Sequence, residues 1–307
     1  MTEKVIICVA PTGALNTRES APYMAYTVEE QALEAKNCED AGASVYHVHV
    51  RDERGANSGD PKIYGELVEH VRAHSNQLIQ IGGALGPVRD PDTGIIGYPF
   101  TEEDRLEALK TKPAPDMFTV KIGAVELRIP AENYDTIGLR NSPKFLRQAI
   151  PTVMNKGLCL ELEIFDLGCL YNAKILEDEG LFGPNGLSSP GCYMHYVMGH
   201  GGQPATMKHL VYMYEEGQKL FPNAEICVSA AADHCYSLVT TAMLLGCNMV
   251  RCGIEDSRRL SNGERATSNV EIVENVVRIA REFGRDAATV EEAAEMLMPK
   301  NAGQRAA

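Results

Sequence analysis

Two histidines, His47 and His49, have the spacing of a metal-binding pair within the run Tyr46-His47-Val48-His49-Val50. Residues i and i+2 of a β-strand point to the same face, so a strand here directs both imidazoles toward one point. Imidazole nitrogen is a good ligand for zinc and for neighbouring transition metals. The alternative is two histidines that are only hydrogen-bonded within a sheet. The charged pair Arg51-Asp52 follows the run and marks the end of the strand, which favours the metal site.

A third ligand is needed, because catalytic zinc sites commonly combine three protein ligands with one open position. Glu255 is the best candidate for this ligand. It directly follows the apolar run Met249–Ile254, which is the eighth such run in the chain. If the runs form a closed barrel, the eighth strand lies one strand away from the second, which carries the histidines. The alternative role for Glu255 is that of a solvated loop carboxylate.

Arg251 also indicates buried chemistry, because it lies inside the apolar eighth run. A guanidinium in such a position must be paired. The available partners are Glu163, late in the fifth run, and Asp256, directly after the eighth. A buried Glu–Arg–Asp network is either structural or a device that orients a catalytic base, and both interpretations stay open. Ser229 and Ser257 have no evident His/Asp relay, so a serine hydrolase is not supported.

Eight apolar runs supply the strands that must position these residues, and stretches with helical periodicity lie between them. The predicted strands are Val5–Ala10, Ser44–Val50, Gln77–Ile81, Met117–Ile122, Leu158–Phe165, Cys192–Met198, Glu225–Ser229 and Met249–Ile254. Eight strands that alternate with helices are typical of an α/β fold of the (β/α)8 TIM barrel type, whose active site lies at the C-terminal ends of the strands. A doubly wound open sheet is the alternative, but no GxGxxG or GxxxxGK[ST] motif stands at a strand–helix junction.

Composition agrees with one large globular domain. The 307 residues carry a formal net charge of −13, and no basic stripe is present to neutralise a nucleic acid. No window approaches the roughly 20 apolar residues that span a bilayer. The nine cysteines are scattered without a CxxC pair, which favours buried thiols in a reducing cytoplasm over disulfides. We therefore predict a single (β/α)8 barrel domain over residues 1–307, with a short flexible tail after Pro299.

Five stretches together resemble the β-keto acid cleavage enzyme family, and the resemblance extends to about residue 298. The stretches are Ala10–Ala14, Ala41–Asp52, Pro115–Thr119, Glu161–Gly168 and Val250–Asp256. The resemblance implies a zinc-bearing (β/α)8 barrel that assembles as a homo-oligomer, usually a tetramer. It implies that the enzyme condenses a small β-keto acid with acetyl-CoA as co-substrate. The products are then acetoacetate and the CoA ester of the remaining acyl group, which makes the enzyme an acyltransferase.

The resemblance also implies roles for individual residues. The family's metal ligands fall on His47, His49 and Glu255, which is the set that the strand argument selects. Its catalytic network falls on Glu163, Arg251 and Asp256, and its substrate contacts fall on Thr119 and Gly83. Zinc is the expected metal, with other divalent metals left open.

The sequence departs from the family pattern around the expected substrate pocket. The glutamate that meets the substrate amine in the aminohexanoate enzymes of this family aligns with Leu15, which argues against 3-keto-5-aminohexanoate as the substrate. The family's Ser-Thr-Gly-Gly reads Gln80-Ile81-Gly82-Gly83, so the usual serine contact is missing. We therefore expect the family's chemistry with a changed substrate pocket.

A second enzyme class, the amidohydrolase-like metal hydrolases, also places a His-x-His pair on a barrel strand. Lys121 in the fourth run and Asp256 after the eighth fit that pattern. However, the pair belongs on the first strand in that class, and the fifth strand needs a histidine. The fifth run here offers Glu161 and Glu163 instead. A non-catalytic barrel that keeps the histidines as structure is a third possibility.

Overall fold

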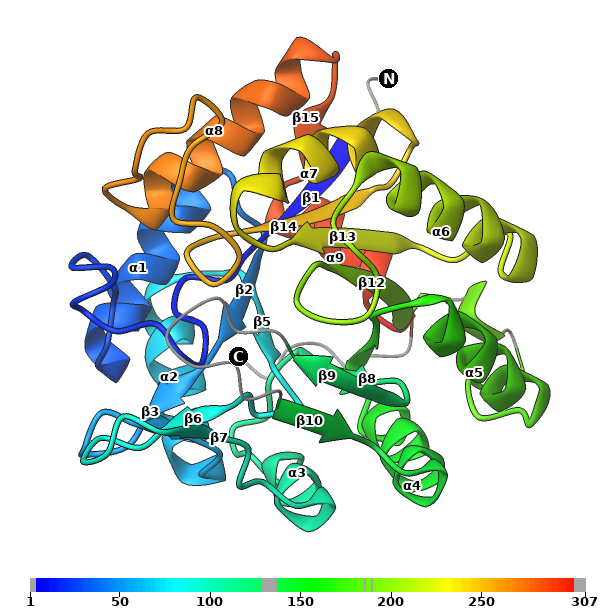
Figure 1. The fold of residues 1–307 in the computed structure, drawn as a ribbon, viewed down its shortest axis with the longest axis horizontal. Coiled ribbons are helices and arrows are strands. Elements are labelled where there is room, and N and C mark those ends of the chain that lie inside the picture. The colour runs from blue at the N-terminus through cyan, green and yellow to red at the C-terminus, as the bar shows by residue number, and fades with distance from the viewer. Residues whose placement is uncertain (1–3, 128–136, 185, 189, 301–307) are drawn as a thin grey trace.

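The computed structural model describes residues 4–127, 137–184, 186–188 and 190–300, and it contains a closed barrel of eight parallel strands (Figure 1). The order around the barrel is β1, β2, β5, β8, β11, β12, β13 and β14, and β14 pairs with β1 to close it. The strands are β1 (Lys4–Val9), β2 (Val45–Val48), β5 (Leu78–Ile81), β8 (Met117–Lys121), β11 (Cys159–Ile164), β12 (Cys192–Met198), β13 (Ile226–Ala230) and β14 (Met249–Cys252). The predicted (β/α)8 TIM barrel is confirmed, and the open sheet is excluded.

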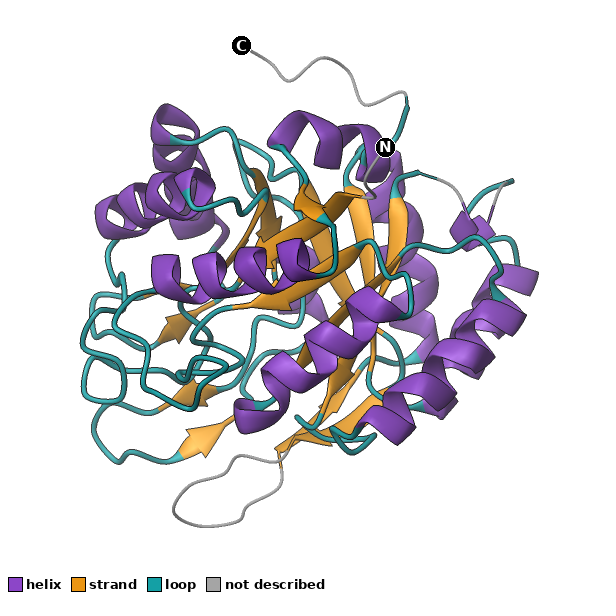
Figure 2. Cartoon of the chain, turned by 90° about the horizontal axis from the view of Figure 1, so that it is seen from above, coloured by secondary structure: helices purple, strands orange, loops and turns teal. Residues whose placement is uncertain are grey.

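Helices surround the barrel and cover the outer faces of its strands (Figures 1 and 2). Three of the described helices begin with a capping box, formed by Thr27 with Glu30, Thr101 with Asp104 and Thr289 with Glu292. The helices are α1 (Val28–Asp40), α2 (Pro61–His74), α3 (Glu102–Ala108), α4 (Pro143–Asn155), α5 (Leu167–Asp178), α6 (Met207–Leu220), α7 (Cys235–Leu244), α8 (Asn269–Glu282) and α9 (Val290–Leu297).

The connections that follow β2, β5 and β8 each contain a short β-hairpin. They are formed by β3 (Val50–Arg51) with β4 (Asn57–Ser58), β6 (Val88–Arg89) with β7 (Ile96–Gly97), and β9 (Ala124–Leu127) with β10 (Ile137–Arg140). The second predicted strand is therefore divided: β2 ends at Val48, and His49 lies between β2 and β3. A further two-residue strand, β15 (Asp286–Ala287), pairs with β1.

The side chains that point into the barrel change from apolar to mostly polar along the strands. Near the N-terminal ends the inward side chains form an apolar cluster, which α9 covers with Ala293 and Leu297. Two residues further along each strand, the same faces carry mostly polar side chains, because i and i+2 point the same way. We call these residues the polar band: Cys8, His47, Gln80, Thr119, Glu161, His195, Ser229 and Arg251. Each of them is at most 3% exposed, so the polar band is closed off from bulk water.

Candidate active site

His47, His49 and Glu255 meet at the C-terminal end of the barrel. Glu255 Oε2 lies 3.6 Å from His47 Nε2 and 3.7 Å from His49 Nε2, and one possible ligand atom of each residue lies within 4.8 Å of the others. His47 is on β2 and His49 directly follows that strand. Glu255 follows β14, which lies one strand away from β2 because β1 pairs with both. The three residues that the sequence selects are thus close in space.

The donor atoms of this cluster suit a divalent cation. Glu255 Oε2 is buried and has no hydrogen-bond partner among the described residues. Burial lowers the pKa of His49 to about 3, so its imidazole is neutral, which is the form that binds a metal. Burial on its own raises the pKa of Glu255, but Arg251 and then the two histidines outweigh it and lower that pKa. Two imidazoles and one ionised carboxylate form a common zinc ligand set.

Glycines border the cluster where no side chain would fit. A Cβ atom on Gly13 would lie 3.0 Å from Glu255 Cγ, and one on Gly86 would lie 3.1 Å from His49 Cε1. Both glycines also have positive φ angles, +65° and +74°, which other residues rarely adopt. The backbone can therefore approach the candidate ligands closely at these two positions.

Arg251 and Asp256 form a buried pair beside the cluster. Arg251 donates from Nε to Asp256 Oδ2 at 3.0 Å and from Nη2 to Asp256 Oδ1 at 2.7 Å, and its Nη2 lies 3.4 Å from Glu255 Oε1. Burial on its own raises the pKa of Asp256, but Arg251 and then His200 hold it well below its usual range. Asp256 is thus an ionised carboxylate held in a fixed, two-point geometry next to the third candidate ligand.

Glu163 is close to this pair but not bonded to it. In the described part of the chain, no hydrogen bond or ion pair joins Glu163 to Arg251. The strands β12 and β13 lie between those that carry the two residues. Burial and the neighbouring Glu161 carboxylate raise the pKa of Glu163 to about 8. The structure thus bonds two members of the predicted Glu–Arg–Asp network to each other, Arg251 and Asp256.

The two predicted substrate-contact residues, Thr119 and Gly83, lie next to each other. The backbone N–H of Gly83 donates to Thr119 Oγ1 at 2.9 Å. A Cβ atom on Gly83 would lie 2.0 Å from the Thr119 carbonyl oxygen, so only glycine fits there. Thr119 is the middle residue of β8, and Gly83 lies two residues after the end of β5. The preceding residue, Gly82, borders the His47 ring.

The polar band contains hydrogen bonds that the sequence analysis missed. Ser229 Oγ lies 2.8 Å from His195 Nε2, and His195 Nδ1 lies 3.0 Å from Glu161 Oε1. Ser229 does therefore have a His–carboxylate relay, contrary to the expectation from the sequence. All three side chains are at most 1% exposed, so the relay lies inside the barrel without contact to bulk water. The missed signal is that every one of the eight runs carries its inward polar or thiol residue at the same depth.

His200 is a further neighbour of the site that was not predicted. It lies in the loop after β12, and its Nε2 atom is 3.5 Å from Asp256 Oδ1. That loop reads Gly199-His200-Gly201-Gly202, a glycine-rich pattern that is typical of an ordinary turn after a strand.

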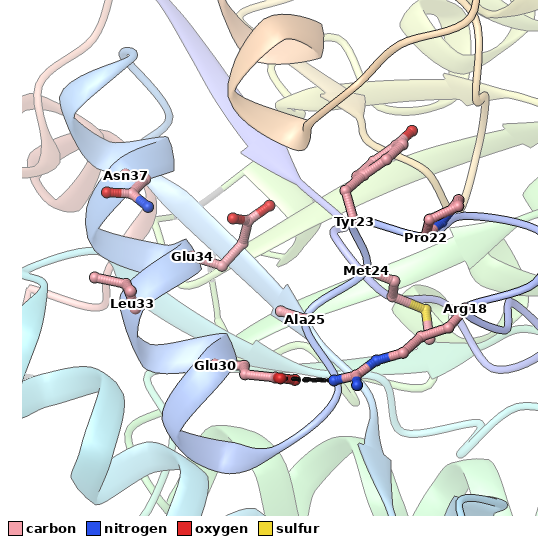
Figure 3. A pocket seen from close by; sticks show the side chains of 9 residues that line it. All are labelled: Arg18, Pro22, Tyr23, Met24, Ala25, Glu30, Leu33, Glu34 and Asn37. Atoms are coloured by element: carbon pink, nitrogen blue, oxygen red, sulfur yellow. Dashed lines mark hydrogen bonds and ion pairs between the residues drawn. The ribbon is translucent and has the colours of Figure 1, made fainter.

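A surface hollow of about 340 Å³ lies away from these residues, between α1 and residues 18–25 (Figure 3). The ion pair between Arg18 and Glu30 stands at its edge. None of the candidate site residues lines this hollow. Among the described residues, no helix has the length and apolar content to cross a membrane. The cysteines are all buried and free.

Comparisons with known proteins show which family and fold this chain resembles. Residues 4–298 match a family model described as beta-keto acid cleavage enzyme. The chain is 33% identical over 302 residues to a 3-keto-5-aminohexanoate cleavage enzyme from Acetoanaerobium sticklandii, covering 96% of this chain and 98% of that protein. It is 26% identical to a 3-oxoadipate:acetyl-CoA acetyltransferase from Cupriavidus necator, covering 97% and 95% of the two chains. A solved structure of ObcA in a ternary complex with a C4-CoA adduct and oxalate has the same fold, with a TM-score of 0.70, 18% identity, and coverage of 90% of this chain and 67% of that one.

Proposed function

The chain belongs to the β-keto acid cleavage enzyme family, and we propose that it transfers an acyl group from a β-keto acid to CoA in a metal-dependent reaction with acetyl-CoA. The supporting observation is the meeting of His47, His49 and Glu255 beside the Arg251–Asp256 pair at the C-terminal end of the barrel. In barrels of this kind that end carries the chemistry. Relatives named for cleavage of a keto acid and for transfer to or from acetyl-CoA support the reaction type.

We propose His47, His49 and Glu255 as the ligands of a divalent cation, with zinc as the first expectation. A bound cation of this type would supply Lewis acidity toward the keto oxygen of the substrate. The proposal is supported by the unpartnered Glu255 Oε2 atom and by the neutral state of His49.

Asp256 is proposed as the group that accepts the C2 proton of the β-keto acid. Arg251 makes it a weak base but holds it in one orientation, so its contribution is positioning rather than base strength. Glu163, with a pKa near 8, enters the reaction in its protonated form and is proposed to donate a hydrogen bond to the substrate without transferring its proton. Thr119 and Gly83 are proposed as substrate contacts.

The reaction then balances without a further reactant. C2 of the keto acid bonds to the acetyl carbon of acetyl-CoA while the thioester C–S bond breaks. The released CoA thiolate bonds to the former keto carbon, and the bond between that carbon and C2 breaks. Asp256 returns its proton to C2, which yields acetoacetate and the new acyl-CoA.

The apolar side chain of Leu15 affects which β-keto acid the enzyme can accept as substrate. It lies two residues after Gly13, which borders Glu255, and it is only partly buried. An apolar side chain here offers no partner to an amine, so we propose a substrate other than 3-keto-5-aminohexanoate. The identity of the acyl group is left to experiment.

The alternative of an amidohydrolase-like enzyme is not favoured by the comparisons. The test is a panel of β-keto acids incubated with the zinc-loaded enzyme, with and without acetyl-CoA, and analysed for acetoacetate. The proposal expects acetoacetate from at least one keto acid and only when acetyl-CoA is present. A product that forms equally well without acetyl-CoA would indicate a hydrolase.

A further inference from the structure

Gln80 lies in the polar band between the candidate ligand His47 and the carboxylate of Glu161. Its Oε1 atom is 2.8 Å from His47 Nδ1, and its Nε2 atom is 3.1 Å from Glu161 Oε2 and 2.6 Å from the Tyr193 hydroxyl oxygen. Each of these four residues is at most 1% exposed. Bulk water therefore does not compete for their hydrogen bonds, and the bonds act on one another.

The direction of these hydrogen bonds is set by Glu161, because an ionised carboxylate can only accept. Burial on its own raises the pKa of Glu161, but its polar neighbours, His195 first, outweigh burial and lower that pKa to about 2. Gln80 must therefore present its NH2 group to Glu161 and its carbonyl oxygen to His47. Because a carbonyl oxygen can only accept, a proton of His47 must lie on Nδ1.

We propose that Gln80 is a positioning residue that holds His47 as the Nδ1–H tautomer and leaves the lone pair of Nε2 directed toward Glu255. The imidazole nitrogen that carries no proton is the one that binds a metal, and the bond made by the other nitrogen selects it. The proposal rests on the proposed function in one respect, which is that Nε2 of His47 is a metal ligand.

The second histidine of the cluster lacks such a partner. His49 Nδ1 is buried without a hydrogen-bond partner in the described part of the chain, so Gln80 acts on one ligand of the pair. Gln80 also stands where the family pattern has serine. The bond to His47 is therefore a property of this chain and is not carried over from the resemblance.

The tautomer is measured by ¹⁵N NMR of the metal-free enzyme labelled at histidine, with the His47 signals assigned by their loss in His47→Gln. Wild type is expected to show His47 protonated at Nδ1. Gln80→Glu, which keeps a carboxyl acceptor, is expected to retain that form, and Gln80→Met is expected to show a mixture of the two tautomers. A wild-type enzyme whose His47 is protonated at Nε2 overturns the proposal, and this readout needs no variant of Gln80 to fold.

Metal affinity provides a second readout, through competition of the metal-free enzyme with a chromophoric chelator for Co²⁺. Gln80→Met is expected to weaken binding roughly 10- to 100-fold, the usual cost of losing an outer partner of a ligand, and Gln80→Glu is expected to recover most of it. Ser229→Ala, an equally buried change in the polar band, is the control and leaves the Kd unchanged. Wild-type affinity in a folded Gln80→Met enzyme overturns the proposal and leaves the proposed function standing. A wild type that binds neither Co²⁺ nor Zn²⁺ overturns the proposed function, while the NMR result still decides the tautomer.

Discussion

Asp256 and Glu163 are two carboxyl groups whose surroundings drive their pKa values in opposite directions. Arg251 and His200 outweigh burial and hold the pKa of Asp256 well below its usual range, while burial and Glu161 raise that of Glu163 to about 8. One group is therefore ionised and the other protonated at neutral pH. Opposed carboxyl pairs of this kind often divide the roles of base and acid in an enzyme.

Asp256→Asn tests the assignment of the proton acceptor. We expect turnover to fall at least about 100-fold, which is typical for the loss of a general base. The metal content per chain should stay at the wild-type level, because the three candidate ligands are unchanged. Acetoacetate formation and elemental analysis of the same preparation measure the two effects. Full activity in this variant would remove Asp256 from the mechanism.

Glu163 should make stability depend on pH. Its pKa is about 8 in the folded chain and roughly 4.3 when unfolded, so between these values the folded state binds the extra proton. The stabilisation that this proton gives is complete below about pH 4 and is lost as the pH rises through 8. Glu163→Gln carries no titrating group there.

Urea unfolding at pH 6 and pH 9, in one metal state, measures this contribution. Wild type should lose more free energy of unfolding between the two pH values than Glu163→Gln does, by roughly 1 kcal/mol or more. Parallel losses in the two proteins would mean that the pKa of Glu163 is not raised by the fold.

At the scale of elements, the barrel strands were predictable because each is a continuous apolar run that is covered on both sides. The small hairpins were not, since two-residue strands such as Val50–Arg51 and Asn57–Ser58 are too short to show a period. The position of Glu255 relative to the histidines followed from strand order alone. The bonds of Gln80 did not, because they depend on which side chains lie opposite one another inside the barrel.

Helix α9 closes the N-terminal end of the barrel, and Leu297→Ala tests its contribution. Leu297 is 2% exposed in the apolar cluster, so its truncation should cost roughly 2–5 kcal/mol of unfolding free energy. Activity per folded molecule should not change, because the candidate site lies at the other end. Leu33→Ala, at a position 57% exposed on α1, is the matched control and should cost less than about 0.5 kcal/mol. Equal effects of the two changes would contradict the role given to α9.

For the whole molecule, metal and folding should be linked, because the candidate ligands come from different strands of the barrel. A cation that binds only the folded chain at 1,000 times its Kd adds about 4 kcal/mol of stability. Chelation should therefore lower the melting temperature of the purified protein, and added Zn²⁺ should restore it.

Two variants give this experiment its controls. His49→Ala should melt at the same temperature with and without the chelator, whereas His74→Ala, an exposed change at the end of α2, should respond as wild type does. A wild-type protein that is insensitive to chelation would favour the non-catalytic barrel.

The predicted homo-oligomer, the cytoplasmic location and the single-domain organisation of residues 1–307 stay predictions, and residues 1–3 and 301–307 lie outside the described chain.

The fate of the acetyl carbons tests the central claim most directly. The enzyme is incubated with the best keto acid of the panel and with acetyl-CoA that carries ¹³C at the carbonyl, and the products are analysed by NMR. Cleavage as proposed places the label at the keto carbon of acetoacetate and leaves the new acyl-CoA unlabelled. Unlabelled acetoacetate, or label retained in acetyl-CoA while the keto acid is consumed, would contradict the account.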